Sequence, residues 1–123
     1  KKELKAMKRI KTLKERWGTP EFFAPEVYQK AYGPQVDVWA LGCYLYELLV
    51  GEAAFPQRER EGSNLERYLL NGGKRIKRDF ELRMGWGYIT AEAKDMVLGM
   101  LHRDPVKRLS IEECLSHPWI TGE

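Results

Sequence analysis

The sequence lacks the features that mark disulfide scaffolds, zinc modules and membrane-spanning proteins. It holds two cysteines, Cys43 and Cys114, which are too few for a disulfide framework and have no ligand spacing to either histidine. The longest apolar stretch, residues 36–50, is interrupted by Asp37 and Glu47 and is too short to cross a bilayer. No secretory signal is visible. We therefore expect an intracellular, most simply cytoplasmic, protein with structural thiols, no membrane span and no metal site.

The charge of the 123-residue chain is divided unevenly. Residues 1–16 hold eight basic and two acidic side chains, whereas the rest of the chain holds thirteen basic and sixteen acidic ones. Apolar residues from Leu4 to Trp17 recur at helical spacing along this basic arm. A solvated helix or arm explains the pattern, and binding to a phosphorylated surface, nucleic acid, an acidic membrane or a peptide groove is the alternative. Because the body is mildly acidic, nucleic acid is not an expected partner.

Proline and glycine residues predict a loop and a long helix in the first half of the chain. Pro20 and Pro25 predict an extended loop over residues 18–24 and a short helix over residues 25–30. A helix is then expected over residues 35–50, ended by Gly51. This helix has no polar face, so we expect it to be central and covered on all sides.

The second half contains helix caps and no period-2 strand pattern. Three helix starts carry N-cap residues: Ser63-x-x-Glu66, Thr90 and Ser110-x-x-Glu113. The helix after Thr90 is expected to continue to about residue 101. Residues 52–89 are expected to be irregular apart from a helix near 64–70, and they include the basic, glycine-interrupted stretch NGGKRIKRDF at residues 71–80.

Four stretches, in order along residues 17–120, resemble motifs of serine/threonine protein kinases, and one is typical of calmodulin-dependent-kinase-like members. The stretches are GTPEFFAPE at 18–26, DVWALG at 37–42, WGYITAEAKD at 86–95 and DPVKRLSIEECLSHPWI at 104–120. The resemblance implies a mainly α fold that forms the lower half of a kinase C-lobe, a helical bundle around a buried central helix, with the N-lobe absent. Residues 17–123 would form this partial C-lobe. Residues 1–16 resemble no kinase segment and are interpreted as a basic arm or junction.

The triplet His102-Arg103-Asp104 has the letters that open a kinase catalytic loop. That loop continues with Leu and ends on an Asn that binds magnesium, whereas here Pro105 and Leu109 occupy those positions. The triplet is therefore not interpreted as catalytic, and Asp104-Pro105 predicts a turn between two helices.

The resemblance assigns structural roles to five residues. Glu26 and Arg108 would form a buried ion pair that ties the activation segment to the base of the lobe, and two solvated charges are the alternative. Asp37 would lie in the first turn of the central helix, where a carboxylate is favoured. In kinases it also accepts catalytic-loop amides, a partner that this chain lacks. Trp39 and Gly42 belong to the same helix motif, and Trp39, Trp86 and Trp119 are expected in the core.

The resemblance also assigns the loop at residues 18–23. Thr19 would contact the catalytic base of the kinase, with a simple turn hydroxyl as the alternative. The rest of the loop would receive the substrate residue that follows the phosphoacceptor: Gly18, Pro20, Glu21, Phe22 and Phe23. Phenylalanines buried without a substrate role are the alternative.

The sequence has no Gly-rich loop, no paired Lys and Glu, no catalytic Asp-Asn pair and no DFG. We therefore expect no catalytic residue in this chain, and ATP and Mg only in a longer parent kinase. The expected function is the substrate-docking and scaffold part of that kinase, inactive by itself. The alternative is a non-catalytic, kinase-derived protein-binding module. Expected partners are a protein substrate or the remainder of the kinase domain, and an exposed apolar patch would favour self-association.

Overall fold

The computed structural model describes residues 8, 17–29, 32–56, 68–70 and 75–123. Within these residues the chain is helical and has no strand. The elements follow in this order: η1 (Pro20–Phe22), η2 (Pro25–Gln29), α2 (Gln35–Val50), α4 (Arg75–Glu81), η4 (Met84–Tyr88), α5 (Ala91–Met100), α6 (Ile111–Leu115) and α7 (Pro118–Thr121). Of the basic arm, only Lys8 lies among the described residues, and it is helical and exposed.

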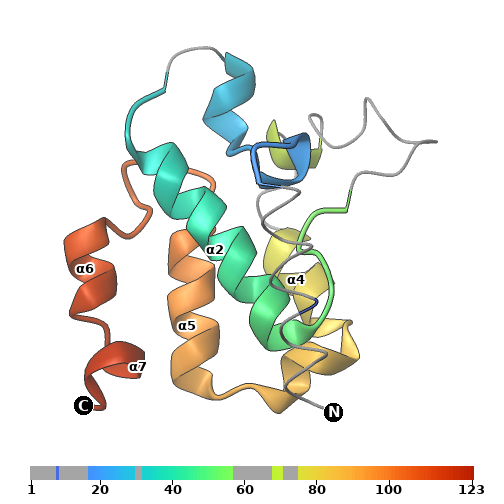
Figure 1. Cartoon of the computed structure of the whole chain (residues 1–123), viewed down its shortest axis with the longest axis vertical. Helices are drawn as coiled ribbons and strands as arrows, with labels where there is room; N and C mark the ends of the chain where they lie inside the picture. Colours follow the sequence, from blue (N-terminus) through green and yellow to red (C-terminus); the bar gives the residue numbers. More distant parts are fainter. Residues whose placement is uncertain (1–7, 9–16, 30–31, 57–67, 71–74) are drawn as a thin grey trace.

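Helix α2 runs through the middle of the molecule, with α5 beside it and α4 at its C-terminal end (Figure 1). Its bounds are those that the sequence predicts. Gly51 ends it in the left-handed conformation, at φ +93°, and donates its N–H to the Glu47 carbonyl at 2.9 Å. A residue with a Cβ is strained at this φ, which explains why glycine stops the helix here.

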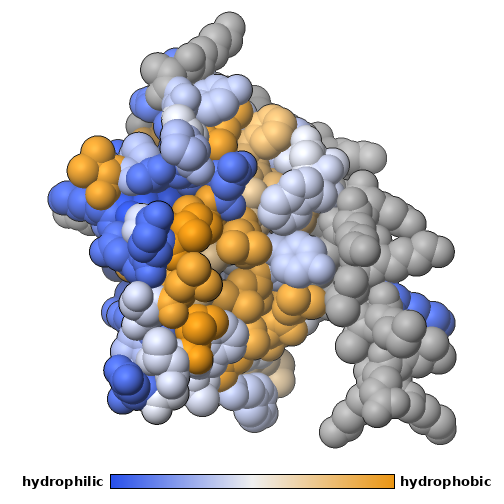
Figure 2. Space-filling view, turned by 60° about the vertical axis from the view of Figure 1, so that its left-hand side comes forward, coloured by the Kyte–Doolittle hydropathy of each residue, from blue (hydrophilic) through white to orange (hydrophobic). Residues whose placement is uncertain are grey.

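The expectation that α2 is covered on all sides is wrong. Leu41 and Leu48 are 42% and 40% exposed, and Asp37 in the first turn is also exposed. These residues share one stripe of the helix, while Trp39, Cys43 and Tyr46 on the other side are buried. An apolar side chain is buried only where another element packs against it, so the composition of a helix does not by itself show which of its sides is covered. Figure 2 shows hydrophobic surface gathered as a band down one face of the molecule, so the expected exposed apolar surface is present.

The main core is built on aromatic rings from α2 and the segments that follow it. Tyr46, Phe80 and Trp86 form a three-ring cluster, in which Tyr46 lies 4.3 Å from Phe80 and 5.9 Å from Trp86 between ring centroids, and Phe80 lies 5.3 Å from Trp86. Trp39 stacks on Phe55 at 5.3 Å. A second buried cluster joins α2 to the C-terminal helices: Val38, Met96, Met100 and Cys114. Trp119 is only partly buried against this cluster, so of the three tryptophans expected in the core, Trp39 and Trp86 are fully inside.

The expectation that residues 52–89 are irregular apart from a helix near 64–70 is wrong for residues 75–81 and 84–88, which form α4 and η4. Ile76 and Phe80 are one helical turn apart and both buried, so α4 forms because it has an inward face against α2. The basic composition of this stretch hides that spacing. Residues 68–70 are helical, in agreement with a helix near 64–70, but the capping box Ser63-x-x-Glu66 lies outside the described residues.

The other predicted caps are confirmed. Thr90 accepts a hydrogen bond from the Ala93 N–H, and Ser110 and Glu113 form a reciprocal capping box. The loop over residues 18–24 is not wholly extended, because η1 occupies its centre. The short helix after Pro25 is the 3-10 helix η2, and residue 30, its expected end, lies outside the described residues. No helix among the described residues is long and apolar enough to cross a membrane.

Candidate functional site

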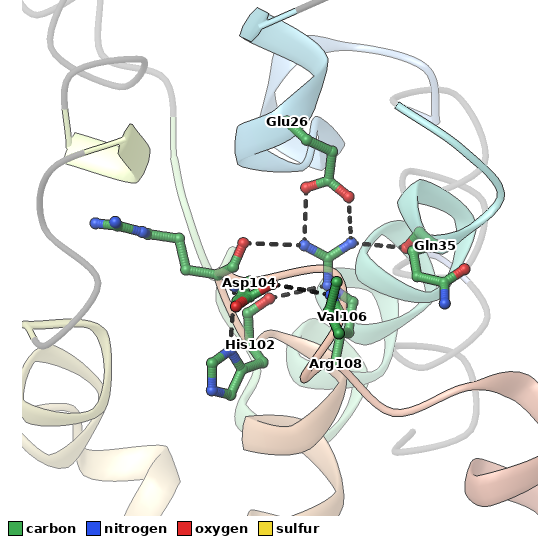
Figure 3. Close-up of polar contacts among 7 residues, drawn as sticks. Glu26, Gln35, His102, Asp104, Val106 and Arg108 are labelled. Carbon is green, nitrogen blue, oxygen red and sulfur yellow. Dashed lines mark hydrogen bonds and ion pairs between the residues drawn. The ribbon is translucent and has the colours of Figure 1, made fainter. Parts of the chain in front are cut away.

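Glu26 and Arg108 form a buried, bidentate ion pair (Figure 3). The two guanidinium nitrogens donate to the two carboxylate oxygens at 2.7 and 2.8 Å, and the side chains are 0% and 5% exposed for Arg108 and Glu26. The residues are 82 positions apart in the chain. The alternative of two solvated charges is therefore excluded, and the pair fastens η2 to the turn before α6.

Arg108 also organises the backbone around it. It donates to three carbonyl oxygens, those of His102 at 2.9 Å, Gln35 at 2.8 Å and Arg103 at 3.4 Å. Its guanidinium carbon lies 5.2 Å from the centre of the Trp39 ring. A guanidinium carries five N–H donors in a fixed fork, so it can hold a carboxylate and carbonyls at the same time. One side chain therefore joins η2, the start of α2 and the turn at residues 102–108.

The loop that the resemblance assigns to substrate contact packs on α2. Gly18 takes a positive φ of +93°. Phe22 is buried and contacts Trp17, whose ring also lies 5.8 Å from that of Tyr44 in α2. Phe23 is partly exposed, with its ring 6.2 Å from that of Tyr28. Phe22 is thus a core residue, whereas the ring of Phe23 reaches the surface.

Thr19 precedes η1 but does not cap it with its side chain. Its hydroxyl oxygen is buried and has no hydrogen-bond partner among the described residues. A buried hydroxyl without a hydrogen-bond partner destabilises the fold. Because buried polar groups are normally hydrogen-bonded, we infer that a group outside the described residues binds the Thr19 hydroxyl. The indole nitrogen of Trp39 is likewise buried without a partner in the described part of the chain.

Asp37 and Gly42 serve α2 itself. Asp37 is exposed in the first turn of α2, where the helix dipole favours a carboxylate. Gly42 lies where α2 meets α5, and a Cβ there would come 2.9 Å from the Met100 Cβ. Glycine at this position therefore permits the close approach of the two helices.

A cavity of about 230 Å³ opens beside the ion pair. It is bounded by η2, which includes Glu26, by Leu70 and by the turn at residues 103–105. The described residues hold no cluster of side chains suited to a metal ion. In the region shown in Figure 3, Arg108 joins η2, the start of α2 and the turn at residues 102–108.

The sequence did not indicate two further junctions. Arg83 pairs with Glu52 at 3.2 Å and donates to the Tyr46 hydroxyl at 3.0 Å and to the Ala53 carbonyl at 2.9 Å. Burial raises the pKa of Tyr46, and the arginine opposes that rise only in part. Isolated charges such as Arg83 give no pairing signal in sequence, because their partners lie tens of residues away.

The second junction is at the C-terminal end. The buried His117 lies 2.7 Å from the Asp95 carboxylate through Nε2, and its Nδ1 accepts the Trp119 N–H to cap α7. With Nδ1 accepting, Nε2 carries the proton and donates to the carboxylate. The residues His117, Pro118 and Trp119 belong to the last of the four kinase-like motifs. Here the local contact within that motif is the cap in which the His117 side chain accepts the Trp119 N–H.

A central helix buried on one side and a carboxylate–guanidinium junction between the activation-segment motif and the last motif are the features that the resemblance to the C-lobe of a protein kinase implies. The comparison with known families agrees, because residues 3–120 match the protein kinase domain. The chain belongs to this family. The match runs through most of the basic arm, and the division of the chain at residue 16 stays a prediction.

Within the protein kinase family, the similar proteins are calcium-dependent protein kinases, which places this chain among the serine/threonine kinases that resemble calmodulin-dependent kinases. The chain is 46% identical over 106 residues to calcium-dependent protein kinase 24 of Oryza sativa subsp. japonica, and 42% identical over 106 residues to calcium-dependent protein kinases 11 and 4 of Arabidopsis thaliana. Each match covers 86% of this chain and 19% or 20% of the relative. The chain thus spans about a fifth of the length of these kinases.

Proposed function

We propose that this chain is the scaffold and substrate-docking part of a serine/threonine protein kinase. The parent kinase transfers the γ-phosphate of ATP, held with Mg, to a serine or threonine of a protein. The chain contributes the rigid base of the C-lobe and the loop at residues 18–23 that receives the substrate, and by itself it does not bind ATP or transfer phosphate.

The observation that carries this proposal is the Glu26–Arg108 junction. Positioning is most of what a kinase does in catalysis, because phosphoryl transfer depends on holding nucleotide, metal and acceptor in line. The bidentate pair holds the base of the loop that carries Thr19 and Phe23 against α2 and the turn at residues 102–108. A substrate-docking loop needs this kind of anchoring so that the acceptor hydroxyl stays within reach of the catalytic base.

Two observations support the role of the loop. The Thr19 hydroxyl is buried and lacks a partner among the described residues, which suits contact with a catalytic aspartate from the rest of the domain. Phe23 offers a partly exposed ring that suits an apolar substrate side chain. The exposed leucines of α2, Leu41 and Leu48, suit cover by the remainder of the kinase domain.

A chimaera tests the docking role. Residues 17–123 replace the matching stretch of the rice relative, and phosphorylation of a serine peptide is measured against the intact relative. We expect an active chimaera, loss of activity with Arg108→Met, and a fall in kcat with Thr19→Ala. A chimaera that folds and binds nucleotide but transfers no phosphate would contradict the proposal.

Nucleotide titration of the 123-residue chain tests the rest. A ligand at a hundredfold excess over its Kd stabilises a protein by about 2.7 kcal/mol, which is a visible rise in Tm. We expect no shift with ATP and Mg. If the chimaera is inactive and the chain still captures a protein partner through its exposed apolar surface, the non-catalytic binding module is the better assignment.

A further inference from the structure

Three large apolar side chains stand out from the surface within seven residues of one another. Leu82, Met84 and Tyr88 are 79%, 83% and 86% exposed. Single exposed apolar residues are ordinary on any protein, but a group of three on one short segment indicates an interaction site. With Lys77 and Arg78 of α4, they form what we call the α4–η4 surface. Neither the loop at residues 18–23 nor the ion pair accounts for it.

The fold holds this surface firmly in place. Ile76, Phe80 and Trp86 alternate with the exposed residues and are buried against α2, so α4 and η4 each have a fixed inward face. Arg83, between Leu82 and Met84, is held by Glu52 and Tyr46. In Figure 1, α4 and the turn that follows it lie at the C-terminal end of α2. The apolar side chains are therefore presented by an anchored segment.

The same segment is basic. Between residues 74 and 88 the sequence has five basic and two acidic side chains. Lys77 and Arg78 are exposed on α4, and Leu82 lies in the turn that directly follows the helix. Of the two acids, Asp79 accepts a hydrogen bond from the Tyr68 hydroxyl at 2.5 Å, and Glu81 is exposed at the end of α4. Positive charge next to protruding apolar side chains favours an anionic, amphiphilic partner.

We propose that the α4–η4 surface binds the headgroup region of an anionic lipid bilayer. Leu82, Met84 and Tyr88 protrude from the body instead of lining a cavity such as the one beside Glu26. A bilayer interface surrounds protruding side chains without needing a matching groove, and tyrosine is favoured at that depth. Lys77 and Arg78 contact anionic headgroups. Because none of the described helices could cross a membrane, the association is peripheral.

Co-sedimentation with vesicles tests this proposal on the full 123-residue chain. One set of vesicles is phosphatidylcholine alone, and the other contains phosphatidylserine as well. We expect binding to the phosphatidylserine vesicles only, weakening as salt is added. Lys77→Gln with Arg78→Gln should lower the affinity by roughly 25-fold, at about fivefold for each basic side chain. Leu82→Ser with Met84→Ser should lower it by about tenfold.

A matched control comes from the turn before α6. Val106 is 89% exposed and Lys107 is exposed beside it, so Val106→Ser with Lys107→Gln removes the same chemistry from another surface. This variant should keep the parent affinity. Since all of these side chains are exposed, far-UV circular dichroism and the urea midpoint should be unchanged in every variant.

Four results would overturn the proposal. Lipid binding that survives the Leu82 and Met84 changes, or that is lost equally in the control, would show non-specific attraction. Binding that is lost only on Lys8→Gln with Arg9→Gln would place the contact in the basic arm. Binding to polyglutamate without binding to vesicles would assign the surface to an acidic protein. The vesicle experiment measures neither nucleotide binding nor phosphorylation, so its outcome does not depend on the proposed kinase role.

Discussion

Replacing Arg108 with methionine should be among the most damaging single changes in this chain. Methionine fills part of the volume but donates no hydrogen bond, so the Glu26 carboxylate loses both of its guanidinium contacts while its side chain stays 5% exposed. The carbonyls of Gln35, His102 and Arg103 lose a charged donor at the same time. The substitution therefore leaves one buried charge and three carbonyls without their Arg108 contact.

The expected cost is about 3 to 5 kcal/mol, the range for removing one member of a buried ion pair. We expect the upper part of this range, because each lost carbonyl contact adds about 1 kcal/mol. With a urea slope of about 2 kcal/mol per M, a loss of about 4 kcal/mol lowers the unfolding midpoint by about 2 M. A loss of that size is a large fraction of the stability of a small domain, about 5 to 15 kcal/mol.

The assay is urea unfolding followed by circular dichroism, with two companions to Arg108→Met. Arg103→Met changes a nearby exposed arginine and should cost less than about 0.5 kcal/mol. The double variant Glu26→Leu with Arg108→Met removes both charges and should recover part of the loss, because apolar replacements of a buried pair are often tolerated. Equal midpoints for Arg108→Met and Arg103→Met, or no recovery in the double variant, would refute this account of the junction.

Three further predictions concern the core. Gly85→Ala should destabilise the fold by about 1 to 3 kcal/mol in the same urea assay, because its Cβ would lie 2.3 Å from the Val50 carbonyl oxygen, whereas Gly87→Ala meets no atom within 4 Å and should be neutral. Because the pKa of the Tyr46 hydroxyl is raised in the folded state, this hydroxyl ionises at a lower pH in the unfolded chain than in the folded one. The stability that Tyr46 contributes should therefore be complete below about pH 10 and should fall as the pH rises further. Tyr46→Phe should make the stability depend less on pH in this alkaline range. Burial raises the pKa of the Cys43 thiol well above its usual range, so dithionitrobenzoate should label it only after unfolding, and labelling of the native protein would contradict its placement.

Local signals predicted the helices that begin or end on special residues. The positive φ of Gly51, the Thr90 cap and the Ser110 capping box depend on neighbours within four residues, so α2, α5 and α6 were predictable. Helix α4 was not, because its inward face consists of two residues, Ile76 and Phe80, within a strongly basic stretch. For such a short helix, packing against α2 outweighs local composition.

The candidate site divides in the same way. The motifs that contain Glu26 and Arg108 are recognisable in the sequence, and the resemblance implied that the two residues pair. The contacts of Arg108 with the carbonyls of Gln35 and His102 could be found only from the tertiary structure. The docking roles of Thr19 and Phe23 stay predictions. The buried, unpartnered hydroxyl of Thr19 was invisible in the sequence, since burial depends on how η1 lies against α2.

By itself, the sequence determined the kinase family, the helical class and the position of the central helix, because these follow from short motifs, caps and periodicity. Only the tertiary structure decided which side of α2 is covered, where Arg83 and His117 attach, and which apolar side chains of α4 and η4 remain outside. Those outcomes depend on contacts between residues far apart in the chain, and no local pattern encodes the neighbour that a side chain will meet.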